Sequence, residues 1–138
     1  MSRPYIGGTS GGVMAVSAAT TLTVADSGKK ILLDGSAANV VTLPSVAKGL
    51  EYKVILTATG AAPTIVTNGS ANIIVGTTYS SGDDAVTAVQ SDADADTITF
   101  VNGAVPGDYC DLICDGTNWY AFGFSGADAK LTITKESA

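Results

Sequence analysis

The sequence predicts an all-β protein: an antiparallel β-sandwich or a jelly-roll-like small barrel, preceded by an extended N-terminal arm. From residue 20 onward, short runs of β-branched, aromatic and alternating residues follow one another, and no segment has apolar residues at helical spacing. Glycine-containing turn pairs such as Asn68-Gly69 and Asn102-Gly103 separate these runs. The predicted strands are 20–24, 30–33, 40–43, 52–57, 64–67, 72–79, 85–90, 97–101, 109–114, 119–124 and 130–134.

The clearest local signal is a β-hairpin within residues 106–126. Asp115-Gly116 is typical of a tight two-residue turn, which would place Leu112 opposite Trp119; a four-residue loop over 115–118 is an alternative that changes the partners. One side of the ribbon carries two cysteines, an alanine, Leu112 and Trp119, and we expect this side in the core. The opposite side mixes aromatic and polar residues, and we expect subunit contacts from Tyr109, Tyr120 and Phe122.

Composition indicates that part of the surface is buried in an assembly. The 138 residues suit one domain, and only 14% of them are charged while 46% are apolar. Globular proteins usually have about 25% charged residues. So few charges favour burial of surface against identical subunits or a larger structure, although a monomer covered by Thr, Ser, Asn and Gly remains the alternative.

The charge distribution argues against a nucleic-acid partner. The formal net charge is −6, and no basic residue occurs between Lys53 and Lys130, an interval that holds most of the aspartates. Such an acidic surface repels phosphate backbones. No apolar run reaches the roughly 18 residues of a membrane span, so no membrane partner is expected either.

The N-terminus and the cysteines indicate synthesis in a cytosol. The first residues have one basic side chain and no apolar stretch typical of a secretory signal. Cys110 and Cys114 on one strand would have Cα atoms about 13 Å apart, whereas a disulfide requires less than about 7 Å. We therefore expect two free, buried thiols.

Residues 1–16 are predicted to form the arm, and residues 17–138 a single sandwich domain. The arm is rich in glycine and lacks periodicity, but its apolar anchors favour ordering on assembly over a loose linker. We expect Arg3, Pro4, Tyr5 and Ile6 to contact a capsid or a neighbouring subunit.

The residues that carry common catalytic chemistry are sparse, and we expect neither an enzyme nor a cofactor. The sequence has no histidine, which removes Ser-His-Asp and Cys-His catalysis and the usual zinc sites. Asp92, Asp94 and Asp96 would project from one side of an extended strand and form a weak candidate for a Ca²⁺ site. The alternative, a solvated acidic loop, is favoured.

Two segments resemble virion proteins of tailed bacteriophages. The run from Asp111 to Tyr120, DLICDGTNWY, is similar to a signature that closes small, trimer-forming domains of capsid decoration proteins, head fibres and tail fibres. Residues 40–44, VVTLP, followed by 49–54, GLEYKV, look like a strand-loop-strand unit of the same proteins. The likeness extends over residues 20–125 and rests on turns and strand edges.

The resemblance implies a non-enzymatic capsid decoration, or cement, protein that binds the outer surface of the head as a homotrimer and stabilises the shell. Its partners would be itself and the major capsid protein, after synthesis in the host cytoplasm. The alternative is a fibre or knob module of the virion that recognises a host surface. A cellular carbohydrate-binding sandwich is a third class, and it requires Trp119 and Tyr120 to be exposed on one face.

Overall fold

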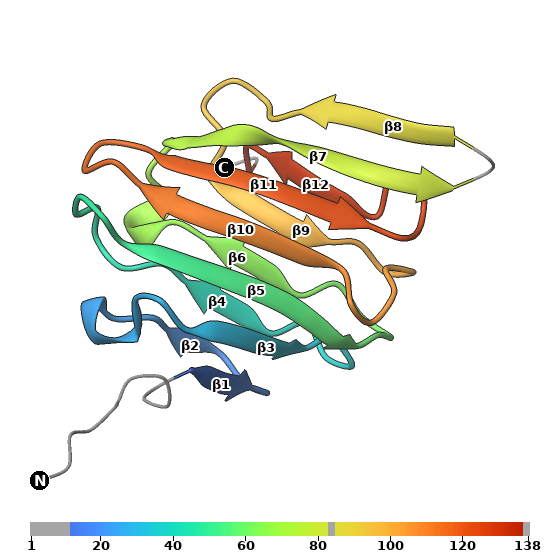
Figure 1. The fold of residues 1–138 in the computed structure, drawn as a ribbon, viewed down its shortest axis with the longest axis horizontal. Helices are drawn as coiled ribbons and strands as arrows, with labels where there is room; N and C mark the ends of the chain where they lie inside the picture. The colour runs from blue at the N-terminus through green and yellow to red at the C-terminus, as the bar shows by residue number, and fades with distance from the viewer. Residues whose placement is uncertain (1–11, 83–84, 137–138) are drawn as a thin grey trace, which may run out of the picture.

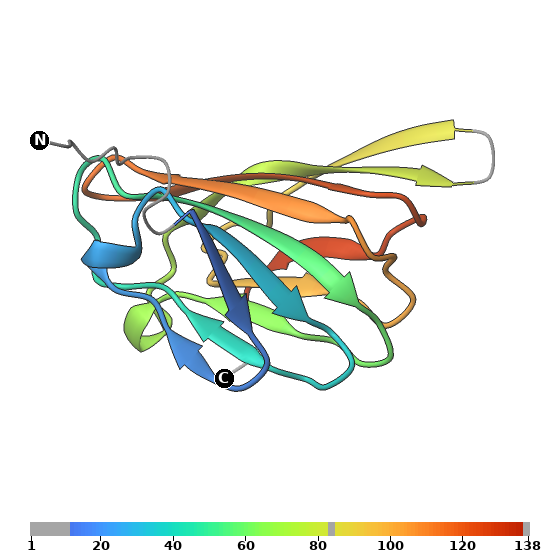
Figure 2. The same ribbon diagram turned by 60° about the horizontal axis from the view of Figure 1, so that its bottom comes forward.

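The computed structural model describes residues 12–82 and 85–136, and its two β-sheets pack face to face, which confirms the all-β prediction (Figures 1 and 2). Two short 3₁₀ turns, η2 (Val24–Asp26) and η3 (Asn68–Ser70), accompany the strands. The strands are β1 (Val13–Val16), β2 (Thr20–Thr21), β3 (Lys30–Asp34), β4 (Val40–Thr42), β5 (Glu51–Ala58), β6 (Thr64–Val66), β7 (Ile74–Gly82), β8 (Ala85–Gln90), β9 (Thr97–Phe100), β10 (Tyr109–Cys114), β11 (Trp119–Ser125) and β12 (Leu131–Thr134).

Sheet A has seven strands in the order β1-β3-β5-β10-β11-β7-β8, and sheet B has five in the order β12-β9-β6-β4-β2. Half of the strand pairings are parallel, so the antiparallel part of the prediction is wrong for them. From β1 to β6 each strand lies in the sheet opposite to its predecessor, and strands of one sheet therefore run in the same direction. The glycine-containing turns between β1 and β6 therefore connect a strand of one sheet to a strand of the other, and they do not close hairpins within one sheet.

Strand β1 lies in the segment that the sequence assigned to the arm. It pairs in parallel with β3, and Val16 is 2% exposed and belongs to the core. The boundary after residue 16 therefore moves to before Val13. The predicted arm contacts Arg3, Pro4, Tyr5 and Ile6 fall outside the described residues.

The core lies between the sheets and is made mainly by alternate residues of the strands, with β2 and β8 contributing none. Trp119 is its largest fully buried side chain, and its ring centroid lies 5.9 Å from that of Tyr52. Leu112, the other residue assigned to the core, is also fully buried. Burying one such apolar side chain contributes about 1.5–3 kcal/mol. Other fully buried members are Ile31, Leu33, Val41, Leu43, Leu56, Ile65, Ile74, Ile98 and Phe100.

The hairpin has the four-residue loop, and the two-residue register is wrong. Cys114 pairs with Trp119, and Leu112 pairs with Ala121. The Asp115 carboxylate decides the loop because it accepts the backbone N–H groups of Thr117 and Asn118 at 2.8 and 2.7 Å. These bonds hold the pKa of Asp115 below its usual value. Because the pairing register differs by two residues from the predicted one, each side chain stays on the same side of the hairpin, and Leu112 and Trp119 still point into the core.

We predict that Gly76→Ala destabilises the protein by more than about 2 kcal/mol. Gly76 pairs with Ala121 in the parallel β7–β11 ladder, and a Cβ atom at Gly76 would overlap the backbone carbonyl of Ala121. Gly126→Ala is the control, since its Cβ would meet only side chains, with Val105 Cγ2 at 3.3 Å. Urea unfolding measures both variants, and equal losses would contradict the assigned register.

Candidate functional site: the outer face of sheet A

One face of sheet A has no covering layer among the described residues, and it is rich in aromatic and aliphatic side chains. Ile113 and Phe122 are 53% and 50% exposed, and Val75 and Tyr79 are each 44% exposed. Most exposed apolar residues on monomers are scattered, whereas contiguous patches mark contact surfaces. We call the following set the outer aromatic face: Val75, Tyr79, Tyr109, Ile113, Tyr120, Phe122 and Phe124, on β7, β10 and β11.

Register brings these side chains together. Tyr109 of β10 pairs with Phe124 of β11, which pairs with Tyr79 of β7, so three aromatic residues form one row across the sheet. A shallow depression of about 140 Å³ lies beside this row and also touches Phe122. Directly opposed side chains on neighbouring strands lie close enough to contact each other. The row is therefore continuous, and a partner side chain could fill the depression beside it.

A charged region borders the outer aromatic face. Lys53 Nζ lies 3.8 Å from Asp111 Oδ1 and 4.5 Å from the ring centroid of Tyr109. Lys29 and Lys30 join Lys53 around an open depression of about 420 Å³ that reaches Phe122. An exposed ion pair of this kind contributes at most about 1 kcal/mol to stability. Glu51 and Asp111 also line the depression, so the region presents charges of both signs and an aromatic edge to the same approaching surface.

The three predicted contact residues occur on this one face: Phe122 is exposed, and Tyr109 and Tyr120 are half-buried. Sequence reasoning did not single out Tyr79 or Lys53. The alternation along β7 and β5 could have identified both residues, because every second residue of those strands faces outward.

The acidic triplet is not gathered into a metal site, and among the described residues no group of three acidic or cysteine side chains is placed to hold a metal ion. Residues 91–96 include a turn at 93–94, with Asp94 at φ 59°, and do not form the extended strand on which the metal-site alternative depended. Asp92 and Asp94 are exposed, whereas Asp96 is buried. The Asp96 carboxylate accepts the N–H of Glu136 and the hydroxyl of Thr97, both at 2.8 Å, so it fastens the C-terminal segment to β9.

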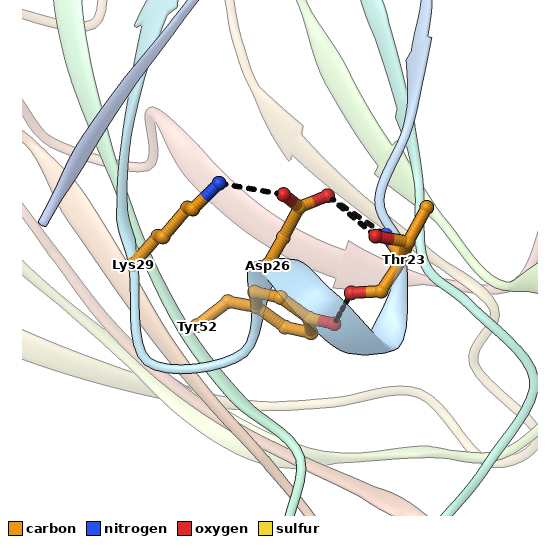
Figure 3. Close-up of polar contacts among 4 residues, drawn as sticks. All are labelled: Thr23, Asp26, Lys29 and Tyr52. Atoms are coloured by element: carbon orange, nitrogen blue, oxygen red, sulfur yellow. Dashed lines mark hydrogen bonds and ion pairs between the residues drawn. The ribbon is translucent and has the colours of Figure 1, made fainter. Parts of the chain in front are cut away.

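A polar cluster fixes the turn η2 against sheet A (Figure 3). Asp26 Oδ2 accepts the backbone N–H and the hydroxyl of Thr23 at 3.0 Å, and Asp26 Oδ1 lies 2.8 Å from Lys29 Nζ. The Tyr52 hydroxyl donates to the Thr23 carbonyl at 2.7 Å. The hydrogen bond from Lys29, together with the weaker effect of the bonds from Thr23, holds the pKa of the Asp26 carboxyl below its usual value. Burial, reinforced by the Asp26 charge, raises the pKa of Tyr52 to about 12.

Comparison of the chain with protein-family models, with curated proteins and with solved structures finds no match. Within residues 12–82 and 85–136, no helix has the length and apolar character needed to cross a membrane. Trp119 is fully buried and points away from its neighbour Tyr120, so the two rings do not form the exposed sugar platform that the carbohydrate-binding class requires.

We predict that Tyr52→Phe lowers stability at neutral pH by about 1 kcal/mol, the contribution of one hydrogen bond. The folded protein holds the Tyr52 proton more tightly than the unfolded chain, in which tyrosine titrates near 10. This stabilisation is complete below pH 10 and is lost as the pH rises towards 12. The difference between the two proteins should therefore shrink between pH 10 and 12 in urea unfolding. Parallel stability profiles over that interval would contradict the assignment.

Proposed function

We propose that this chain is a structural protein of a tailed-phage virion, a capsid decoration protein that binds the outer surface of the head as a homotrimer and stabilises the shell. Its partners are further copies of itself and the major capsid protein. The protein is non-enzymatic and uses no cofactor. It is made in the host cytoplasm and acts on the virion.

The observation that carries the proposal is the outer aromatic face. About half of the surface of Ile113 and of Phe122 is in contact with solvent, at the middle of a seven-stranded sheet. Leaving several large apolar groups in water costs about 25 cal/mol for each Å² that an interface could bury. Contact with further copies removes this cost and also explains why only 14% of the residues are charged.

The proposed mechanism is mechanical. A single subunit offers the shell one weak contact, whereas three linked subunits engage it together at a high effective concentration. The residues before β1 are the proposed anchor to the shell, and the outer aromatic face is the proposed contact between copies. The sequence resemblance at 111–120 supports the virion assignment, and the composition and exposed face support assembly.

A second candidate is a knob that recognises a host surface. The open depression beside Phe122 favours it, because an exposed ring beside charged groups of both signs, Lys30 and Lys53 with Glu51 and Asp111, suits a saccharide receptor. In that case the protein would bind cells and leave the shell unbound, with or without residues 1–11.

We predict a mass by light scattering of three times the 13.8 kDa chain. Phe122→Lys should weaken trimer formation at least about tenfold, since it replaces an interface anchor with a charge. Val24→Lys is the matched control, because Val24 is 62% exposed but lies in η2, away from the outer face. A monomeric wild-type chain, or an unchanged Phe122→Lys trimer, would contradict the proposed contact.

Capsid binding is tested by co-sedimentation with the heads of the phage that encodes the chain. The full chain should bind, and a chain lacking residues 1–11 should remain trimeric and bind far more weakly. The deletion ends before β1, so it spares the sheet. A trimer that ignores heads in both forms would refute the decoration proposal and favour the knob.

A further inference from the structure

Strand β8 is the least covered strand of the molecule. All six of its residues are exposed, and Val86 is 69% exposed. Among the described residues β8 pairs with β7 alone, and it extends past sheet B, so neither face of β8 is packed (Figure 2). Strand β7 itself is anchored by buried residues such as Ile74 and Thr78. An edge strand that is held by one ladder and has no packed face gains stability from a partner that covers it.

The open edge of β8 is suited to strand pairing. Ser91 N donates to Gly76 O at 2.8 Å, and because bonded pairs alternate in an antiparallel ladder, the N–H groups of Val86, Ala88 and Gln90 point away from β7. Residues 85–90 contain no charge and no proline. Natural edges are usually protected by charge, proline or shortness, and β8 has none of these.

Both edge strands of sheet B are protected, one by its shortness and the other by flanking charges. Strand β2 has two residues, and β12 is bracketed by Lys130 and Lys135. At the opposite edge of sheet A, β1 resembles β8: it is uncharged, Val13 is 64% exposed, and no described strand pairs with its outer side. Sheet A thus has two open, uncharged edges.

The two edge strands run in opposite directions, and the segments beside them carry opposite charges. In sheet A, β1 runs opposite to β8, so β8 of one copy placed beside β1 of the next forms an antiparallel pair. The register runs continuously from Val13 through Lys30 on one side of the sheet to Gln90 on the other. With rows aligned, Asp92 and Asp94, which follow β8, lie towards the end of the next sheet that carries Lys30 on β3, whereas Lys29 at that end is already paired with Asp26.

We propose that β8 of one copy pairs with β1 of a second copy, head to tail, and that this contact links sheet A of neighbouring subunits. The proposal deepens the homotrimer proposed above by adding an edge contact to the one proposed at the outer aromatic face, and it rests on that homotrimer only for the number of copies. A two-fold pairing of β8 with itself would leave the open edge of β1 unpaired in both copies. The head-to-tail contact uses both open edges of every copy, and its rotation can close a ring of three.

The pairing is tested by cross-linking the full chain. Val13→Cys combined with Gln90→Cys puts thiols on opposite edges and on the same face, and Val13→Cys with Ala88→Cys covers a shift of two residues. Paired strands bring Cα atoms to about 4.5–5.5 Å, within the reach of a disulfide. The native Cys110 and Cys114 are buried and do not interfere.

On oxidation, at least one double variant should give covalently linked dimers and trimers, and each single variant should give none. Absence of links in both double variants would overturn the proposal, as would efficient linking through Ala88→Cys alone, which indicates pairing of β8 with itself. Because no capsid takes part, this result is separate from the binding of heads. A trimer that binds heads without β8–β1 links would overturn the pairing alone.

A charge exchange provides the second test. At low ionic strength, Lys30→Glu and Asp92→Lys should each weaken trimer formation several-fold, and the double variant should recover the wild-type level because the opposite charges are restored. Lys48→Glu is the control, since Lys48 is exposed on the β4–β5 connection and away from both edges. Additive losses in the double variant would overturn the proposed charge match.

Discussion

The burial of one face of sheet A against sheet B is the constraint on which the rest of the structure depends. Trp119 and its neighbours on alternate positions can leave water only if the intervening residues point outward. The core therefore determines which side chains form the outer face. Since β10 and β11 place Tyr109, Ile113 and Phe122 at those outward positions, an apolar surface follows directly from the packing of the core.

Buried carboxylates hold the frame at the ends of the strands. Asp108 accepts the hydroxyl of Ser125 at 2.6 Å and the N–H groups of Val105 and Gly126 at 2.9 and 2.8 Å, which joins the start of β10 to the end of β11. Asp96 performs the same role at the C-terminal segment. Asp96 and Asp108 thus have their buried oxygens hydrogen-bonded and act in the frame of the fold.

Alternation in the sequence was enough to predict the strands and the two faces of the hairpin, because both follow from local geometry. Three features required the structure. A glycine turn such as that at Gly35 does not reveal whether it joins strands of one sheet or of two. The loop after Cys114 depended on the side chain of Asp115. The Asp92–Asp96 segment turns because Asp96 bonds a residue 40 positions away, a contact that spacing cannot predict.

Amide hydrogen exchange in solution tests the proposed assembly through sheet A. The N–H groups of Val86, Ala88 and Gln90 point away from β7 and have no bond within the described chain. If β8 pairs with β1 of the next copy, the amides of Ala88 and Gln90 should exchange slowly in a trimer and rapidly after dilution to monomer. Rapid exchange of both in an intact trimer would contradict the pairing of β8 with β1.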